Sequence, residues 1–151
     1  MMKSLFFMVG LVSIPLAVLS ADEGTSMKDI LSTMSAYVNY LEDSLSQEIV
    51  HLQADIITED GRTFARTLYE GWTYGIAAFG DWRIADLDII VYKDVDGEWI
   101  EITKDNEIDN HPAVEIKPTS TAAYMIQLQV YSFKEDYTSA HYGMLIFHER
   151  P

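Results

Sequence analysis

The chain has 151 residues with a hydrophobic content of 48%, which suits one packed domain and excludes a disordered chain. It contains no cysteine, which excludes disulfides, thiol catalysis and zinc bound through cysteine. The formal net charge is -14, and so acidic a surface repels phosphate backbones and anionic lipid headgroups. We therefore expect no nucleic-acid partner.

Residues 1–20 have the layout of a secretory signal peptide. Lys3 precedes an apolar run from Leu5 to Leu19, and the small residues Val18 and Ser20 precede a cleavage position before Ala21. An uncleaved membrane anchor is the alternative, but the run is shorter than the roughly twenty residues that a helix needs to span a bilayer. We expect a periplasmic or extracellular protein with no stable membrane insertion after cleavage.

Residues 21–60 are predicted to form a polar leader and one long amphipathic helix. Ser26, followed by Asp29, has the pattern of a helix N-cap. The apolar stripe that follows predicts a helix from Met27 to about Gln53. Its members are Met27, Ile30, Leu31, Met34, Tyr37, Val38, Leu41, Leu45, Ile49 and Leu52. The helix is expected either to cover its own domain or to form a homo-oligomer with a second copy.

Residues 61–151 are predicted to form a β-sandwich domain. Short segments of alternating polarity, such as "EWIEIT" and "TAAYMIQLQVYSF", are separated by turns rich in Gly, Asp, Asn and Pro. The "DVDG" segment is typical of a hairpin turn. Six or more such strands favour a mainly β fold, an antiparallel sandwich preceded by the long helix.

The region from Leu68 to His148 resembles the bacterial pre-peptidase C-terminal domain. The order of the segments "GDWRIADLDIIVYKDVDGEW", "HPAVEIKP", "AAYMIQLQVY" and "HYGMLIF" carries the resemblance. The matching residues are Asp81, Asp86, Leu87, Asp88, Gly97, Pro112, Val114, Ile116, Pro118, Tyr124, Tyr142 and Gly143. The resemblance implies an exported, jelly-roll-like accessory domain for binding or targeting, in a family where some members bind calcium, matrix or polysaccharide.

The acidic stretch between Gly80 and Asn110 raises the hypothesis of a calcium site. Asp86 and Asp88 are two residues apart on a strand, so both carboxylates lie on one face and repel each other. Calcium, which takes six to eight oxygen ligands, would relieve that repulsion. The ligands proposed for this site are Asp86, Asp88, Asp81, Asp96 and Asp109.

Ordinary strand and turn chemistry is the alternative explanation of the same acids. Asp86 would then accept backbone N–H groups where the strand begins, and Asp88 would be solvated or pair with Arg83. The Asp96–Gly97 pair would form the hairpin turn.

Trp82 and Trp99 are the candidate ligand-binding residues, because exposed indole rings on a sandwich stack on sugar rings. The alternative is that both tryptophans fill the core. No G-x-S-x-G motif is present, and the histidines lack metal-ligand spacing. We therefore expect an exported, non-enzymatic binding or structural module with a protein or polysaccharide partner. A small secreted hydrolase using carboxylates and a helix-mediated oligomeric scaffold are the alternatives.

Overall fold

The computed structural model describes residues 25–150, so the predicted signal peptide lies outside the described residues. The helical elements are α1 (Lys28–Asn39) and the π-helical turn η1 (Tyr40–Ser44). The strands are β1 (Gln47–Thr58), β2 (Arg62–Leu68), β3 (Tyr74–Gly80), β4 (Ile84–Val95), β5 (Glu98–Asp105), β6 (Ala113–Ile116), β7 (Ala122–Phe133) and β8 (Ser139–Glu149). Within this part of the chain, no helix is both long and apolar enough to cross a bilayer.

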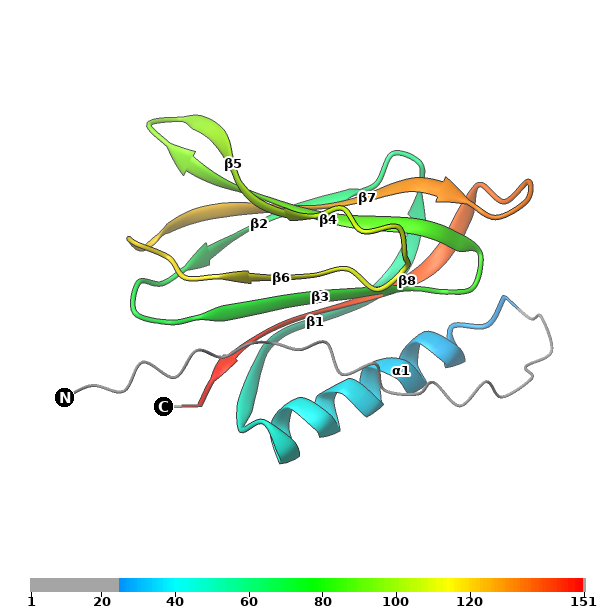
Figure 1. The fold of residues 1–151 in the computed structure, drawn as a ribbon, viewed down its shortest axis with the longest axis horizontal. Helices are drawn as coiled ribbons and strands as arrows, with labels where there is room; N and C mark the ends of the chain where they lie inside the picture. The colour runs from blue at the N-terminus through cyan, green and yellow to red at the C-terminus, as the bar shows by residue number, and fades with distance from the viewer. Residues whose placement is uncertain (1–24, 151) are drawn as a thin grey trace.

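The strands form two four-stranded antiparallel sheets that pack face to face (Figure 1). One sheet has the order β1-β8-β3-β6 and the other has the order β2-β7-β4-β5. Successive strands therefore alternate between the sheets, except for β4 and β5, which are neighbours in one sheet; this is the connectivity of an eight-stranded jelly roll. The predicted mainly β, jelly-roll-like sandwich preceded by a helix is confirmed.

The core lies between the two sheets and follows from the period of two along each strand. On β7 the side chains of Tyr124, Ile126, Leu128 and Val130 all point inward and are buried. β4 and β8 supply further buried aliphatic side chains to the same cluster. The alternating pattern read from the β7 sequence therefore predicted the buried face correctly.

A tight turn joins β4 to β5, and its tip projects from the sandwich in Figure 1. Asp96 and Gly97 both have positive φ angles, 55° and 87°, as a two-residue hairpin turn of type I′ requires. The Asp94 carboxylate accepts a hydrogen bond of 2.8 Å from the Gly97 amide. The "DVDG" segment is thus a hairpin turn, as its sequence indicates.

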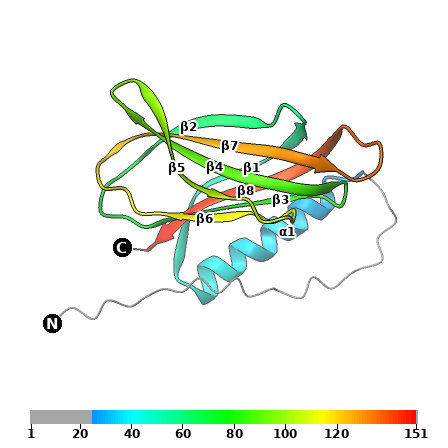
Figure 2. The ribbon, with the colours of Figure 1, turned by 45° about the horizontal axis from the view of Figure 1, so that its top comes forward.

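Helix α1 packs on the outer face of the β1-β8-β3-β6 sheet (Figures 1 and 2). The Ser26 hydroxyl accepts a hydrogen bond of 3.2 Å from the Lys28 amide at the start of the helix. Ile30 and Met34 are buried against the sheet, where Gly143 of β8 leaves room for them. The apolar stripe of the helix is therefore used within its own domain.

The predicted extent of the helix was wrong, because α1 ends at Asn39 and η1 ends at Ser44. Residues 47–58 form strand β1, which pairs with β8 along nearly its whole length. Ser46 has a φ of 52°, a left-handed conformation that ends the helical path. The segment after it is rich in β-branched residues, which favour a pleated sheet. The sandwich thus begins at Gln47, before the expected boundary at residue 61.

Candidate functional site

The two open sides of the sandwich differ, and the side between β1 and β2 is closed by side chains. Arg66 of β2 reaches across to β1, where its Nη1 lies 2.7 Å from Nδ1 of His51. Its Nη2 donates to the Val50 carbonyl oxygen at 3.3 Å. The rings of His51 and Phe64 also lie together, with 5.7 Å between their centroids. These contacts join the two sheets along this side.

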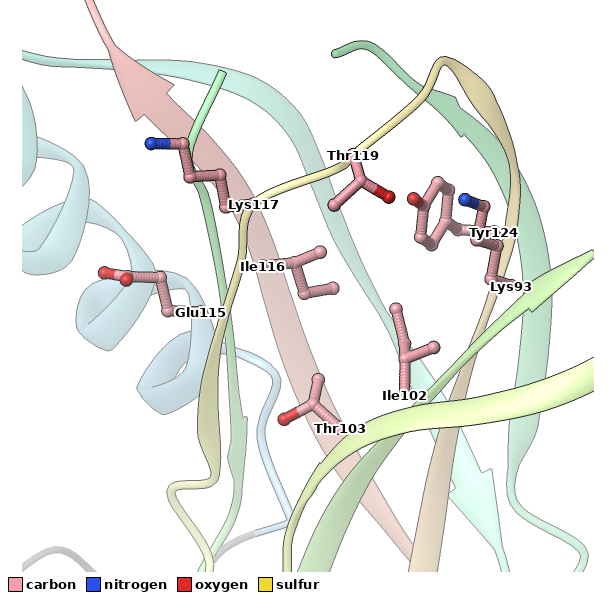
Figure 3. A pocket seen from close by; sticks show the side chains of 8 residues that line it. All are labelled: Lys93, Ile102, Thr103, Glu115, Ile116, Lys117, Thr119 and Tyr124. Carbon is pink, nitrogen blue, oxygen red and sulfur yellow. The ribbon is translucent and has the colours of Figure 1, made fainter. Parts of the chain in front are cut away.

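The opposite side, between β5 and β6, is open. β5 has eight residues and β6 has only four, so much of β5 has no strand facing it across the sandwich. A cleft of about 260 Å³ lies there, and we call it the β5–β6 cleft (Figure 3). It is lined by Lys93, Ile102, Thr103, Glu115, Ile116, Lys117, Thr119 and Tyr124.

The interior of the cleft combines aliphatic walls with a tyrosine hydroxyl. Ile102 and Ile116 point into it from opposite sheets in Figure 3. Tyr124 of β7 is only 1% exposed, and its hydroxyl forms no hydrogen bond with residues 25–150. The hydroxyl is not among the fully buried atoms that lack a partner, so it borders the open space of the cleft. In Figure 3 this hydroxyl points toward Thr119. Burial raises the pKa of Tyr124, so the phenol stays neutral and can both donate and accept a hydrogen bond.

One lysine, Lys93, gives the cleft a positive group within an acidic protein, whereas Lys117 points in Figure 3 to the same side as Glu115. Lys93 donates a hydrogen bond of 2.8 Å to the Ser120 hydroxyl, and its ammonium lies 6.0 Å from the centroid of the Tyr124 ring. Neither Lys93 nor Lys117 forms an ion pair with any carboxylate of residues 25–150. In Figure 3 Glu115 points away from the space between the two isoleucines. Lys93 is therefore available to an anionic group of a ligand.

The β4–β5 hairpin extends the apolar wall beyond the cleft itself. Lys93 pairs with Ile100 across the hairpin, and Val95 pairs with Glu98, so these side chains lie on the face that continues inward to the core. Val95, Ile100 and Ile102 are 45%, 46% and 42% exposed, respectively. Large apolar side chains so exposed on one projecting hairpin are typical of an interaction surface.

The polar groups that line the cleft are mainly hydroxyls and charged side chains. The hydroxyls that line it belong to Thr103, Thr119 and Tyr124, and no histidine is among the lining residues. A nucleophilic hydroxyl needs a base within hydrogen-bond distance, and none of these three has such a partner among the described residues. The arrangement can hold an apolar group and orient a polar one.

Asp81, one of the five proposed calcium ligands, belongs to a buried ion pair instead. Its carboxylate accepts hydrogen bonds from the Arg83 side chain and from the backbone amides of Arg83 and His141. Burial alone raises the pKa of Asp81, but these hydrogen bonds outweigh burial and lower it. Asp81 therefore joins β8 to the corner between β3 and β4, and Asp88 does not pair with Arg83.

The structure gathers Asp86, Asp88 and Asp109 of the proposed set in one region, together with Asp105. Burial and the neighbouring Asp86 and Asp105 raise the pKa of Asp88 to about 6. Burial and Asp109 also raise the pKa of Asp86, whose Oδ1 is buried with no hydrogen-bond partner in the described chain. Asp96 lies apart, at the hairpin turn. Within residues 25–150, no three acidic or histidine side chains are placed to share one metal ion.

The two tryptophans proposed as ligand-binding residues lie apart, and neither lines the cleft. Trp82 is half-buried and meets Tyr137 edge to face, with ring centroids 5.1 Å apart. Trp99 is exposed on β5 and pairs with Asp94, so it lies on the hairpin face opposite Ile100. Sequence reasoning missed the cleft residues as a site, although Ile116 and Tyr124 belong to the motifs that it singled out.

No family model matches the chain, and no curated protein does. Among solved structures, a mitogen derived from Yersinia pseudotuberculosis is similar, with 17% identity over 68% of this chain and 86% of its own, and a TM-score of 0.49. PirA has 9% identity over 66% of this chain and 95% of its own, with a TM-score of 0.42. A CBM4 structure has 12% identity over 73% of this chain and 83% of its own, with a TM-score of 0.39. None of the three is a pre-peptidase C-terminal domain, so that resemblance stays a prediction.

Proposed function

We propose that the chain is an exported, non-enzymatic binding module whose ligand occupies the β5–β6 cleft. The observation that carries the proposal is the cleft itself, which places the Tyr124 hydroxyl and the Lys93 ammonium beside two aliphatic walls, Ile102 and Ile116. The Tyr124 hydroxyl forms no hydrogen bond with residues 25–150 and borders the cleft, so it can donate to or accept from a ligand there.

The surroundings of that hydroxyl support the same function. Ligand sites are concave and mostly apolar, with a few polar groups that fix the orientation of the ligand. Ile102 and Ile116 supply apolar walls, and Lys93 and Thr119 supply polar groups within the same cleft. Arg66 closes the other side of the sandwich, whereas the β5–β6 side is open between the two sheets.

Binding of small fragments observed by NMR tests the proposal. A library of aliphatic acids, saccharides and short peptides would be added to the isotope-labelled protein, and the shifted amides mapped. We expect hits that shift the amides of β5, β6 and Lys93. Fragments that bind only at other places, or turnover of any of them, would contradict a non-enzymatic module with its site at this cleft.

Two matched variants test whether the fragments bind in the cleft. Ile102→Asp places a charge in the cleft, whereas Ile56→Asp places the same charge on β1, where Ile56 is similarly exposed at 46%. We expect Ile102→Asp to weaken fragment binding about tenfold or more and Ile56→Asp to leave it within about twofold. Equal effects of the two variants would show that the charge acts through the whole protein and not through the cleft.

A further inference from the structure

Strand β5 ends its sheet, so one edge of its backbone has no neighbouring strand. The same holds for β6 in the other sheet, and the two edges border the β5–β6 cleft. Unpaired edges are templates for another strand, and proteins usually protect them with charges, proline, short length or a bulge. β6 is short and is followed by Pro118, whereas β5 is long and contains no proline, although it carries a bulge and four charged residues.

Strand β5 differs from an edge covered by charges alone, because it also exposes large hydrophobic side chains. Trp99, Ile100 and Ile102 are all exposed large hydrophobic residues on this strand. The pairing of β4 with β5 shifts register between Val91 and Tyr92, so Ile102 is the extra residue of a bulge. The bulge turns Ile102 into the cleft, where it faces Ile116 in Figure 3.

The chemistry of the cleft distinguishes a peptide from a polysaccharide. Sugar rings bind by stacking on exposed aromatic faces. Here the Tyr124 ring is buried, and Trp99 lies on the other face of the hairpin. The accessible walls are aliphatic, and they lie beside an unpaired strand edge. Aliphatic pockets along a strand edge are the features by which proteins add an extended peptide to a sheet.

The charge of the cleft indicates which peptides would bind there. Lys93 lines the cleft and has no carboxylate partner within residues 25–150, whereas Lys117 points away from the cleft beside Glu115 in Figure 3. A second copy of this chain is a poor occupant, because its net charge of -14 repels an identical molecule. A short acidic peptide brings a carboxylate to Lys93 with much less repulsion.

We propose that the β5–β6 cleft binds an extended acidic peptide segment as an additional strand on the free edge of β5. An aliphatic side chain of the peptide lies between Ile102 and Ile116, and a carboxylate lies at Lys93. The Tyr124 hydroxyl is within the same cleft and hydrogen-bonds the peptide. This inference rests on the proposed binding function and names the class of its ligand.

The test begins with a displayed library of random heptapeptides. The library is selected for binding to the protein that contains residues 25–150. We expect selected sequences that alternate aliphatic residues with polar ones and contain Asp or Glu. The best sequence is then made as a fluorescent probe in three forms. One form is unmodified, and the other two carry N-methyl groups on alternate residues, each form blocking the hydrogen bonds of one edge of the extended peptide.

Backbone pairing predicts that only one N-methylated form loses affinity, by about tenfold or more, while the other stays within about threefold. Ile102→Asp should weaken the unmodified probe about tenfold, and Ile56→Asp should not. Lys93→Gln should weaken the acidic probe about threefold to tenfold, and leave unchanged a probe whose acids are replaced by amides. Thermal unfolding of each variant confirms that it is folded.

The outcomes separate the ligand class from the binding function. If saccharide or small fragments bind the cleft and no peptide is enriched, the peptide inference is overturned and the binding module stands. Equal loss in both N-methylated forms would also overturn strand addition. If the protein doubles in mass and Ile102→Asp restores the monomer, a second copy occupies the edge and the peptide is not the ligand. If nothing binds the cleft, the proposed function itself fails.

Discussion

The guanidinium of Arg83 and the carboxylate of Asp81, two residues apart in the chain, form a buried ion pair. Nε of Arg83 lies 3.1 Å from both carboxylate oxygens, and the Asp81 carboxylate also accepts 2.9 Å hydrogen bonds from the amides of Arg83 and His141. The pair therefore fixes the connection between β3 and β4 and attaches it to β8. Nearly all the hydrogen-bonding capacity of the carboxylate is used within the fold.

Arg83→Met should strongly destabilise the protein, because it leaves Asp81 charged, buried and without its main partner. We expect the free energy of unfolding to fall by about 3 kcal/mol or more at neutral pH. Lys104→Met is the matched control, because Lys104 forms an exposed ion pair with Glu101 at 3.5 Å and should contribute less than about 1 kcal/mol. Urea unfolding measures both, and similar losses would show that the Arg83 pair is not special.

Asp88 should make stability depend on pH between about 4 and 6. Burial and the nearby Asp86 and Asp105 raise its pKa from 3.8 to about 6 in the folded protein. The folded protein therefore favours the protonated carboxyl, and that stability is present below pH 3.8 and lost as the pH rises through 6. Asp88→Asn, which stays neutral, should be more stable than the wild type above pH 6 by on the order of 1–3 kcal/mol.

The difference between the two proteins, measured by urea unfolding at several pH values, isolates this residue. It should shrink toward pH 4 and grow toward pH 7. Glu48→Gln removes an exposed charge from β1 and serves as the control for net charge. A wild type and Asp88→Asn protein whose stabilities differ equally at pH 4 and pH 7 would exclude a raised pKa at Asp88.

The contact between Gly143 and the helix predicts a steric effect. A Cβ at position 143 would lie 2.5 Å from the Met34 sulfur and 3.1 Å from the Ile30 Cγ2. Gly143→Ala should therefore displace α1 and lower the free energy of unfolding by about 1–3 kcal/mol. The same change in a Met34→Ala background should cost less, because the shortened side chain leaves space. Additive losses in the double variant would show that the two residues do not press on each other.

The calcium hypothesis makes its own prediction. A cation bound between Asp86 and Asp88 would relieve their repulsion, so the Tm should rise in millimolar calcium and fall with a chelator. Asp86→Ala combined with Asp88→Ala should abolish the response. Magnesium at the same concentration controls for general screening of the acidic surface. A wild-type Tm that does not respond to calcium would end the hypothesis.

The sequence predicted the strands best where alternating polarity and a turn motif indicate the same strand. The alternation from Tyr124 to Val130 identified the buried face of β7, and Asp96–Gly97 identified the hairpin. The same reasoning failed at residues 47–53, because Ile49 and Leu52 continue the helical spacing of the stripe by coincidence. Pairing of β1 with β8 decides that segment, and such long-range pairing is not visible in local periodicity.

The cleft was harder to predict than the fold, because it depends on contacts between distant segments. Lys93, Ile102 and Ile116 come from three strands, and each has an ordinary pattern in the sequence. The opening arises because β6 is shorter than β5, and strand ends are poorly specified by sequence. The acidic residues were a more conspicuous sequence pattern than the cleft residues. The structure nevertheless divides these acids among an ion pair, a turn and a region of raised pKa.

A comparison of Tyr124 with Tyr142 tests whether the hydroxyl at the cleft stabilises the folded protein. The Tyr142 hydroxyl accepts a hydrogen bond from the Gln53 side chain, whereas the Tyr124 hydroxyl has no partner within residues 25–150. Tyr142→Phe should lower the free energy of unfolding by about 1 kcal/mol or more, and Tyr124→Phe should change it by less than about 0.5 kcal/mol. Urea unfolding of the two variants measures the contrast. A large loss in Tyr124→Phe would mean that the hydroxyl stabilises the fold and is not held for a ligand.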